Sequence, residues 1–327
     1  MNRGHLLVAA VSVSAAMLSC GALAQGWNPE RNVELIVPAT AGGSLDTFGR
    51  TVQRLWDELK LVPVSSTVAN RSGGAHAVAY NFLNQHPGDP YYLSITSATI
   101  LTNHINGRLK LTYTDFTTLG VLLTESIAFA VRADSPIKTG KDLLEAFRKD
   151  PGSISVALGS AAGGTHHIAT GLPLQSAGID MSKIKLVSFN SSGEAVTAVL
   201  GGHVDLAVAG TVNVAAQVEA GKLRALSTTS PRRMGGVYAQ TPTWPELGYK
   251  GVFENWRGMI GAKGITPEQV AYWEGVLRRV VQSDEFKKIA EKNQWDSSFR
   301  GSADMRKFLE AQYSELKGVM TFLGLAK

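Results

Sequence analysis

The 327-residue sequence contains a single cysteine, Cys20, and few charged residues. Cys20 lies in an N-terminal apolar segment that we expect to be removed, so the remaining chain has no cysteine. Structural disulfides, cysteine nucleophiles and thiolate metal sites are therefore excluded from it. Charged residues make up 18% of the chain, below the roughly 25% usual for globular domains. The 44% hydrophobic content is sufficient for a sizeable core.

The sequence also lacks a basic stripe. Its formal net charge is +5, or +4 once Arg3 is removed with the N-terminal segment. The densest basic spots are the pairs Arg232-Arg233 and Lys287-Lys288, which we interpret as solvated surface. A nucleic-acid interface would need clustered cations, so we expect no nucleic-acid partner.

The N-terminal segment has the features of an export signal. Arg3 and His5 precede an apolar run over residues 6–23, and Ala-Leu-Ala at 22–24 fits the small-x-small cleavage rule. We expect a signal peptide over residues 1–24, cleavage before Gln25 and a periplasmic product. A membrane helix fits less well because the run is marginally long and rich in small residues. Lipid anchoring at Cys20 is the other alternative, since Met-Leu-Ser-Cys loosely resembles a lipidation box.

Short β-rich runs alternate with helical runs along the rest of the chain, which predicts an α/β fold with parallel sheets flanked by helices. The β-α-β pattern occurs over residues 32–100 and again over 153–210, so we expect two lobes. Lobe 1 would comprise residues 25–126 and 240–327, and lobe 2 residues 127–239. The extended runs 127–136 and 223–229 are interpreted as connecting strands. The predicted core strands are 32–37, 63–68, 91–96, 153–158, 185–189 and 204–208.

Several helix ends are marked by capping residues. Thr139 is predicted to cap one helix, and Thr266 another, with Pro267 at the first helical position and Gln269 completing a capping box. Ser302 is predicted to cap the last helix. Gly171 and Pro173 are expected to shorten or kink the helix that follows the second glycine loop.

Two glycine-containing loops each stand between a predicted strand and a predicted helix. They are VPATAGGSLD at 37–46 and VALGSAAGGTHHI at 156–168. In open α/β sheets ligands lie at such turns, where backbone N–H groups and helix N-termini favour an anion. Neither loop has the Gly-Lys-Ser/Thr of a phosphate loop, and neither has the three spaced glycines of a dinucleotide site. Tight turns without a ligand remain the alternative.

Catalytic interpretations find little support in the sequence. His166 and His167 are adjacent, so they point in different directions on a helix, and no other ligand stands at helical spacing from them. We therefore expect no metal. Ser160, His166 and Asp205 are individually available, but no Gly-x-Ser-x-Gly elbow is present and their spacing does not indicate a triad.

Taken in order, the motifs resemble those of the periplasmic solute-binding receptors of tripartite tricarboxylate transporters, the Bug or TctC family. The resemblance extends from Trp27 to about Leu323. Asn-Trp-Arg-Gly at 255–258 resembles the tricarboxylate-receptor branch. The other motifs are PATAGGSLD at 38–46, NRSGG at 70–74, GSAAGGTH at 159–166, LGGHVD at 200–205, AGKLRAL at 220–226 and TPT at 241–243.

The resemblance implies a type II periplasmic binding fold with two crossing strands as hinge, which closes on a small carboxylate like a Venus flytrap. The resemblance also implies that the protein is not an enzyme and needs no cofactor. Its expected partners are the membrane subunits of a transporter, and we expect the protein to be a monomer. An exported hydrolase or transferase acting on a small anion in the same cleft is the alternative. The expected ligand-binding residues are Thr40, Ala41, Gly42, Gly43, Ser44, Asp46, Ser97, Ser160, Ala161, Ala162, Thr165, His166, Asn190 and Asp205.

The chain departs from the family pattern where a lysine often follows the strand at 185–189. Here the residues are Phe189-Asn190-Ser191, so Asn190 could donate only a neutral hydrogen bond. Neither glycine loop supplies Lys or Arg. The sequence therefore predicts a di- or tricarboxylate held by backbone and hydroxyl donors, and a flat aromatic dicarboxylate is one candidate. Asp46, which would repel an anion, is expected near the N-terminus of its helix, where it can accept from backbone N–H groups or orient a bound water.

Overall fold

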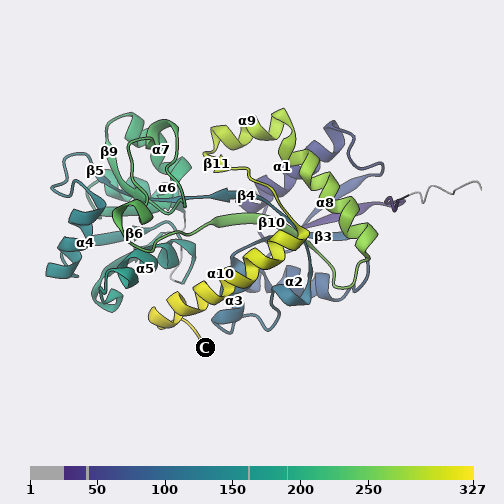
Figure 1. Cartoon of the computed structure of the whole chain (residues 1–327), viewed down its shortest axis with the longest axis horizontal. Coiled ribbons are helices and arrows are strands. Elements are labelled where there is room, and N and C mark those ends of the chain that lie inside the picture. Colours follow the sequence, from purple (N-terminus) through teal and green to yellow (C-terminus); the bar gives the residue numbers. More distant parts are fainter. Residues whose placement is uncertain (1–25, 42–43, 161–162, 190) are drawn as a thin grey trace, which may run out of the picture.

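The computed structural model describes residues 26–41, 44–160, 163–189 and 191–327. The predicted signal peptide, its cleavage site and Cys20 lie outside the described residues. Two mixed β-sheets form the centres of two lobes, each flanked by helices (Figure 1). The predicted two-lobed α/β fold is confirmed.

The first sheet has seven strands, in the order β11-β4-β10-β3-β1-β2, with β12 paired to β4. Its parallel part is β1, β2 and β3, and β10 runs antiparallel to both β3 and β4. The strands are β1 (Val33–Val37), β2 (Ser66–Asn70), β3 (Tyr92–Ser97), β4 (Thr117–Glu125), β10 (Asn255–Gly261), β11 (Trp295–Asp296) and β12 (Arg300–Gly301).

The second sheet has five strands in the order β7-β6-β8-β5-β9. Strands β6, β7 and β8 are parallel, whereas β5 is antiparallel to β8 and β9. The six predicted core strands correspond to β1, β2, β3, β6, β7 and β8, with ends shifted by up to three residues. The strands are β5 (Ile127–Arg132), β6 (Ser155–Leu158), β7 (Lys185–Ser188), β8 (Leu206–Gly210) and β9 (Leu223–Thr228).

The chain crosses between the lobes at Ser126, between the end of β4 in the first sheet and the start of β5 in the second. It returns after β9, through residues 229–254, to β10. The runs predicted to connect the lobes are thus strands of the second sheet, adjacent to the crossings. Both long strands of the first sheet, β4 and β10, extend towards the second lobe (Figure 1).

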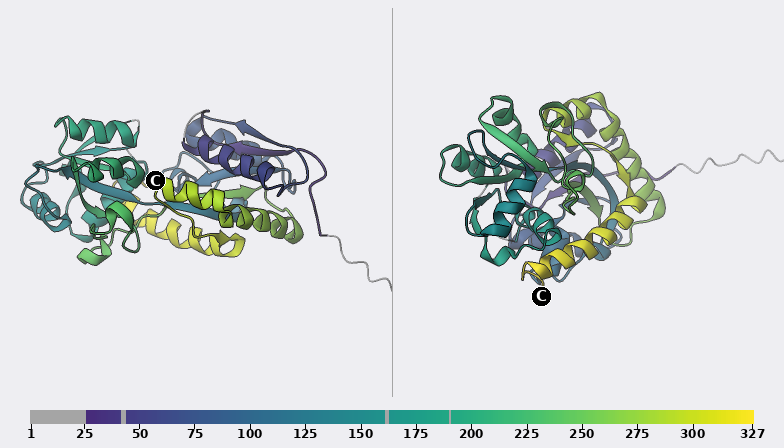
Figure 2. Two further views of the ribbon diagram at one scale, coloured as in Figure 1. Left: turned by 90° about the horizontal axis from the view of Figure 1, so that it is seen from above. Right: turned by 60° about the vertical axis from the view of Figure 1, so that its left-hand side comes forward.

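Ten helices cover the sheets in the described part of the chain, and the last of them spans both lobes. Helix α10 packs against β4 and α3 in the first lobe and against α5 in the second (Figures 1 and 2). The helices are α1 (Ser44–Glu58), α2 (Ala77–Asn84), α3 (Thr99–Ile105), α4 (Gly140–Lys149), α5 (Thr165–Ser176), α6 (Ser192–Leu200), α7 (Thr211–Glu219), α8 (Pro267–Gln282), α9 (Asp284–Lys292) and α10 (Ser302–Phe322).

The predicted caps agree with the structure at two helices out of three. Thr139 caps α4 and Thr266 caps α8, each in a reciprocal capping box. Ser302 is instead the first residue of α10, after the N-cap Gly301. Its hydroxyl donates to the carbonyl of Thr118 at 2.7 Å, so this side chain ties α10 to β4 rather than capping the helix.

Of the two effects predicted for Gly171 and Pro173, shortening of the helix after the second glycine loop does not occur. Helix α5 continues through both residues to Ser176. A Cβ on Gly171 would lie 3.0 Å from a methyl carbon of Leu323, so glycine allows the end of α10 to pack closely on α5. This contact joins the lobes on the side of the C-terminus.

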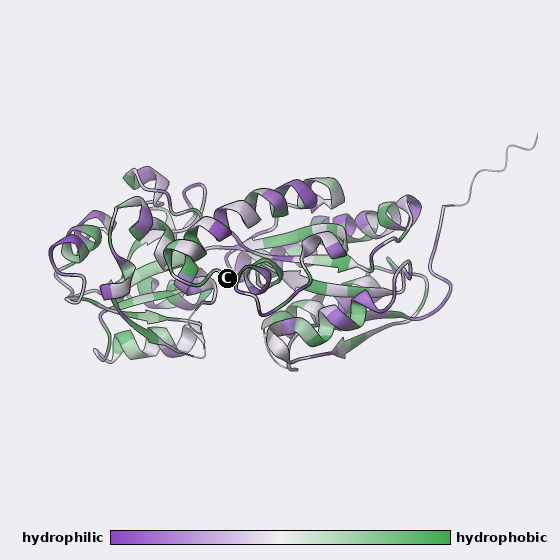
Figure 3. Cartoon of the chain, turned by 90° about the horizontal axis from the view of Figure 1, so that it is seen from below, coloured by the Kyte–Doolittle hydropathy of each residue, from purple (hydrophilic) through white to green (hydrophobic). Residues whose placement is uncertain are grey.

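Apolar residues concentrate on the strands and on the helix faces that cover them (Figure 3). In the first lobe, Trp56 of α1 and Trp273 of α8 are fully buried, with ring centroids 5.6 Å apart. In the second lobe, Trp244 packs edge-on against Phe129 of β5. Since Trp244 follows residue 240, these contacts favour a lobe boundary later than the predicted one.

Among the described residues no helix is both long and apolar enough to cross a membrane.

Candidate functional site

A cavity of about 610 Å³ lies between the carboxyl ends of the two sheets. Its volume is within the range of small-molecule pockets. Six lining residues come from the first lobe: Leu45, Ser97, Thr99, Glu125, Asn255 and Arg257. Seven come from the second lobe: Gly159, Thr165, His166, Ser191, Ser192, Gly193 and Asn213.

Strand pairing explains how the first lobe brings its polar residues together. In the antiparallel ladders, Arg257 of β10 lies opposite Ser97 at the end of β3, and Asn255 lies opposite Glu125 at the end of β4. Directly opposed residues share one face of a sheet, as do residues two apart in a strand. Four polar side chains therefore meet on one face at one edge of the first sheet.

The second lobe presents the N-termini of helices to the same cavity. Thr165 and His166 open α5, and Ser192 and Gly193 open α6, after the N-cap Ser191. Asn213 lies in the first turn of α7. Helix N-termini carry partial positive charge and unpaired N–H groups, so this wall favours a negatively charged ligand.

Arg257 is the cation of the cavity. Its side chain is 14% exposed, and its Nη2 lies 3.8 Å from Oε2 of Glu125, too far for a hydrogen bond. Nη1 donates to Oδ1 of Asn255 at 2.9 Å and to the carbonyl of Trp256 at 3.1 Å. Among the described residues, all hydrogen bonds of the guanidinium come from Nη1. Nη2 is therefore positioned to donate to a bound anion.

Two neutral histidines lie near this cation. Burial, followed by the positive charge of Arg257, lowers the pKa of His166 to about 4, and the same causes lower the pKa of His76 to about 4. Nε2 of His166 lies 3.2 Å from Oγ of Ser192, which also accepts from the backbone N–H of Gly210 at 3.1 Å. The Nδ1 atoms of both histidines are buried without a partner in the described part of the chain.

Three of the predicted ligand-binding residues line the cavity: Ser97, Thr165 and His166. Ser160 lies beside it, with its Oγ 3.4 Å from the backbone nitrogen of His166. Thr40 and Ala41 are exposed. Gly42, Gly43, Ala161, Ala162 and Asn190 lie outside the described residues, as does the side chain of Ser44.

Asp46 lies in the first turn of α1, as expected. Its side chain is buried and accepts from Nδ2 of Asn70 at 2.8 Å and from Nε of Arg50 at 3.0 Å. The negative charge is therefore balanced within the first lobe, which removes its expected repulsion of an anion.

Asp205 is not brought into the cavity. Its carboxylate accepts from the backbone N–H of Ser155 at 2.8 Å and from its hydroxyl at 2.6 Å, at the start of β6. The cavity lies beyond the other end of that strand, at Gly159. Ser160, His166 and Asp205 therefore do not form a triad, and the geometry gives no support to Asp205 as a ligand contact.

The sequence reasoning did not include Glu125, Asn255 or Arg257 among the ligand-binding residues, although residues 255–258 were part of a motif that it used. The expectation that the cavity holds an anion without a cation is corrected by Arg257, which belongs to neither glycine loop. A signal was present, because a charged residue between Trp256 and Gly258, ahead of the apolar run 259–262, is unusual in a buried strand. No group of three potential metal ligands occurs within the residues that the structure describes.

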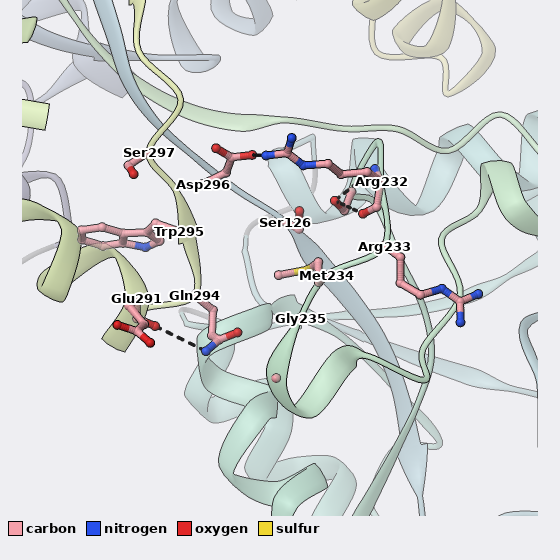
Figure 4. A pocket seen from close by; sticks show the side chains of 12 residues that line it. Ser126, Arg232, Arg233, Met234, Gly235, Glu291, Gln294, Trp295, Asp296 and Ser297 are labelled. Atoms are coloured by element: carbon pink, nitrogen blue, oxygen red, sulfur yellow. Dashed lines mark hydrogen bonds and ion pairs between the residues drawn. The ribbon is translucent and has the colours of Figure 1, made fainter. Parts of the chain in front are cut away.

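A second pocket, of about 470 Å³, lies between the lobes on the other side of the β4–β5 crossing, where Ser126 lines it (Figure 4). Nη2 of Arg232, from the second lobe, reaches Oδ2 of Asp296 in β11 at 2.5 Å. Arg233 is paired with Glu246 at 3.1 Å. Both cations of this pocket are thus matched by carboxylates at hydrogen-bond distance, whereas in the first cavity Glu125 lies 3.8 Å from Nη2 of Arg257.

Comparison with known proteins agrees with this architecture. Residues 58–325 match the family described as tripartite tricarboxylate transporter family receptor. BugT of Bordetella pertussis is 26% identical over 296 residues, covering 86% of each chain. An Agrobacterium vitis relative is 32% identical over 245 residues, covering 74% of this chain and 68% of its own.

Among solved structures, a TctC solute-binding protein from Polaromonas, without ligand, superposes with a TM-score of 0.80 at 25% identity, covering 90% of this chain and 99% of its own. The R. palustris protein Rpa4515 with adipate gives a TM-score of 0.74 at 25% identity, over 91% and 99%. These relatives are substrate-binding receptors and not enzymes. The chain belongs to the family of tripartite tricarboxylate transporter receptors.

Proposed function

We propose that this protein is a periplasmic receptor that binds one small carboxylate between its lobes and delivers it to the membrane subunits of a tripartite tricarboxylate transporter. The observation that carries the proposal is the position of Arg257, a cation that is 14% exposed and whose Nη2 has no hydrogen-bond partner among the described residues. Family membership and the adipate-bound relative support a carboxylate ligand.

The ligand carboxylate is proposed to bind between Nη2 of Arg257 on one lobe and the N-termini of α5 and α6 on the other. Ser97, Thr165 and Ser192 would supply hydroxyl donors, and the predicted contacts of the two glycine loops remain part of the proposal. Such charge-assisted hydrogen bonds replace the water that a carboxylate loses on entering a closed cleft. Because the donors come from both lobes, the ligand favours the closed arrangement.

One observation favours the catalytic alternative: Oγ of Ser192 lies within hydrogen-bond distance of Nε2 of His166. A nucleophile–base pair also needs a group that orients the base, and Nδ1 of His166 has no partner among the described residues. With a pKa of about 4, this imidazole is a weak base at neutral pH. We therefore assign Ser192 and His166 to ligand binding.

A thermal-shift screen with mono-, di- and tricarboxylates tests the proposal on protein freed of bound ligand by unfolding and refolding. The transition temperature should rise with the concentration of at least one carboxylate. Titration calorimetry should then give one site per chain, and mass spectrometry should recover the ligand unchanged. Turnover of the tightest ligand, or no shift with any carboxylate, would contradict the proposal.

A further inference from the structure

Glu125 is the only acidic side chain among the described residues that line the cavity. Its side chain is 15% exposed, and Oε2 accepts a hydrogen bond from Nδ2 of Asn255 at 3.2 Å. A carboxylate has about four acceptor positions on its two oxygens. Asn255 occupies one of these, and the contact with Arg257, at 3.8 Å, is too long to occupy another.

The other oxygen of Glu125 reaches across the cleft to the second lobe. A Cβ on Gly210, at the junction of β8 and α7, would lie only 2.6 Å from Oε1. Glycine at this position therefore leaves the space that the carboxylate occupies. The acidic group is held where a ligand enclosed by both lobes would meet it.

A buried carboxylate is unfavourable in a site that binds only a simple anion. Burial raises the pKa of Glu125, and the nearby Arg257 and Asn255 offset this only in part. The negative charge would also repel the carboxylate of the ligand. A hydrogen-bond donor on the ligand removes this conflict, because it pairs with an acceptor position of the carboxylate that no described residue occupies.

We propose that Glu125 determines ligand specificity by accepting a hydrogen bond from a hydroxyl or ammonium group next to the ligand carboxylate that Arg257 binds. The inference rests on the proposed carboxylate-receptor function. It narrows the ligand class to hydroxy- and amino-carboxylates, in place of unsubstituted or aromatic dicarboxylates. Sites that hydrogen-bond a substituent discriminate strongly against the analogue without it, so we expect a preference of at least about 10-fold.

The test is titration calorimetry with two matched series: succinate, malate and aspartate, then glutarate, 2-hydroxyglutarate and glutamate. The wild-type protein should bind a hydroxy or amino member of one series at least about 10-fold more tightly than its parent. Glu125→Ala should reduce that ratio to about 3-fold or less. Glu125→Gln, which keeps an acceptor oxygen but not the charge, should retain a preference for hydroxyl and lose one for ammonium.

Glu254→Ala is the matched control. Glu254 also pairs with an arginine, Arg300, at 2.5 Å and is 17% exposed, but it does not line this cavity. Glu254→Ala should leave the affinity ratios between substituted and parent dicarboxylates unchanged. If Glu125→Ala fails to fold, Glu125→Gln, which has nearly the same shape as the wild-type side chain, decides between a hydroxyl and an ammonium donor. Equal or tighter binding of succinate and glutarate in wild type, or an unchanged ratio in Glu125→Ala, would overturn the inference while leaving the receptor function standing. No binding by any of the six would also overturn the inference, and the receptor function would then be decided by the wider screen of mono-, di- and tricarboxylates.

Discussion

Replacing Arg257 should abolish most of the ligand affinity while leaving the fold intact. We consider Arg257→Met, which keeps the apolar stem and removes the guanidinium. A hydrogen bond to a charged group contributes about 1.5–3 kcal/mol, and the loss of one or two such bonds from a desolvated site costs about 2–4 kcal/mol. Since about 1.4 kcal/mol is a factor of ten, the dissociation constant should rise by about 30- to 1000-fold.

The same substitution changes the state of Glu125. Arg257 lowers the pKa of this buried carboxyl, so its removal should raise that pKa further and favour the protonated form in the folded protein. The double variant Arg257→Met with Glu125→Gln removes the unpaired charge. It should recover thermal stability relative to Arg257→Met without recovering affinity.

Calorimetry with the tightest carboxylate, together with urea unfolding of each variant, separates the two effects. Arg232→Met is the matched control, because Arg232 is also an interlobe arginine but lines only the second pocket. The reasoning would be refuted if folded Arg257→Met bound the carboxylate within about 3-fold of wild type.

Three further predictions concern the spacing of the cavity walls and the stability of the protein. In Gly159→Ala, the new Cβ would lie 2.8 Å from the Cα of Ser192, so we expect the N-terminus of α6 to be displaced. Calorimetry should then show ligand binding that is weaker by at least about 10-fold, and unchanged affinity would contradict this prediction. Arg232→Ala removes an ion pair between Arg232 and Asp296, whose side chains are 73% and 38% exposed. The free energy of unfolding should therefore fall by less than about 1 kcal/mol, and this loss should be smaller in high salt. A larger loss would contradict the prediction and would show that Arg232 has a role beyond this pair. The pKa of His166, lowered to about 4, means that the folded state binds fewer protons than the unfolded state between about pH 6.5 and 4. This contribution to stability is complete above pH 6.5 and falls by about 2 kcal/mol at pH 5, so urea unfolding of His166→Gln should lack that part of the pH dependence.

The sequence predicted the elements whose signals are local. Alternating strands and helices, the capping box at Thr266 and the two glycine loops each depend on residues within about ten positions of one another. Ser97, Thr165 and His166 were expected from the family resemblance, and they lie at or after the carboxyl ends of β3 and β6, which face the cavity from the two lobes.

The charged pair of the cavity depends on contacts that no local pattern contains. Glu125 and Arg257 are 132 positions apart in the chain (257 minus 125) and are adjacent because β4 and β10 pair. Neither strand was among the predicted core strands. The expectation of a cavity without a cation failed for this reason, since it considered only the loops.

The most direct test of the account is a crystal structure of the protein with its tightest carboxylate. The account predicts the ligand in the cavity between the two sheets, with one carboxylate oxygen within hydrogen-bond distance of Nη2 of Arg257 and another atom within reach of the α5 or α6 N-terminus. A ligand bound elsewhere, for example in the pocket lined by Ser126 and Arg232, or one that leaves Arg257 uncontacted, would contradict it.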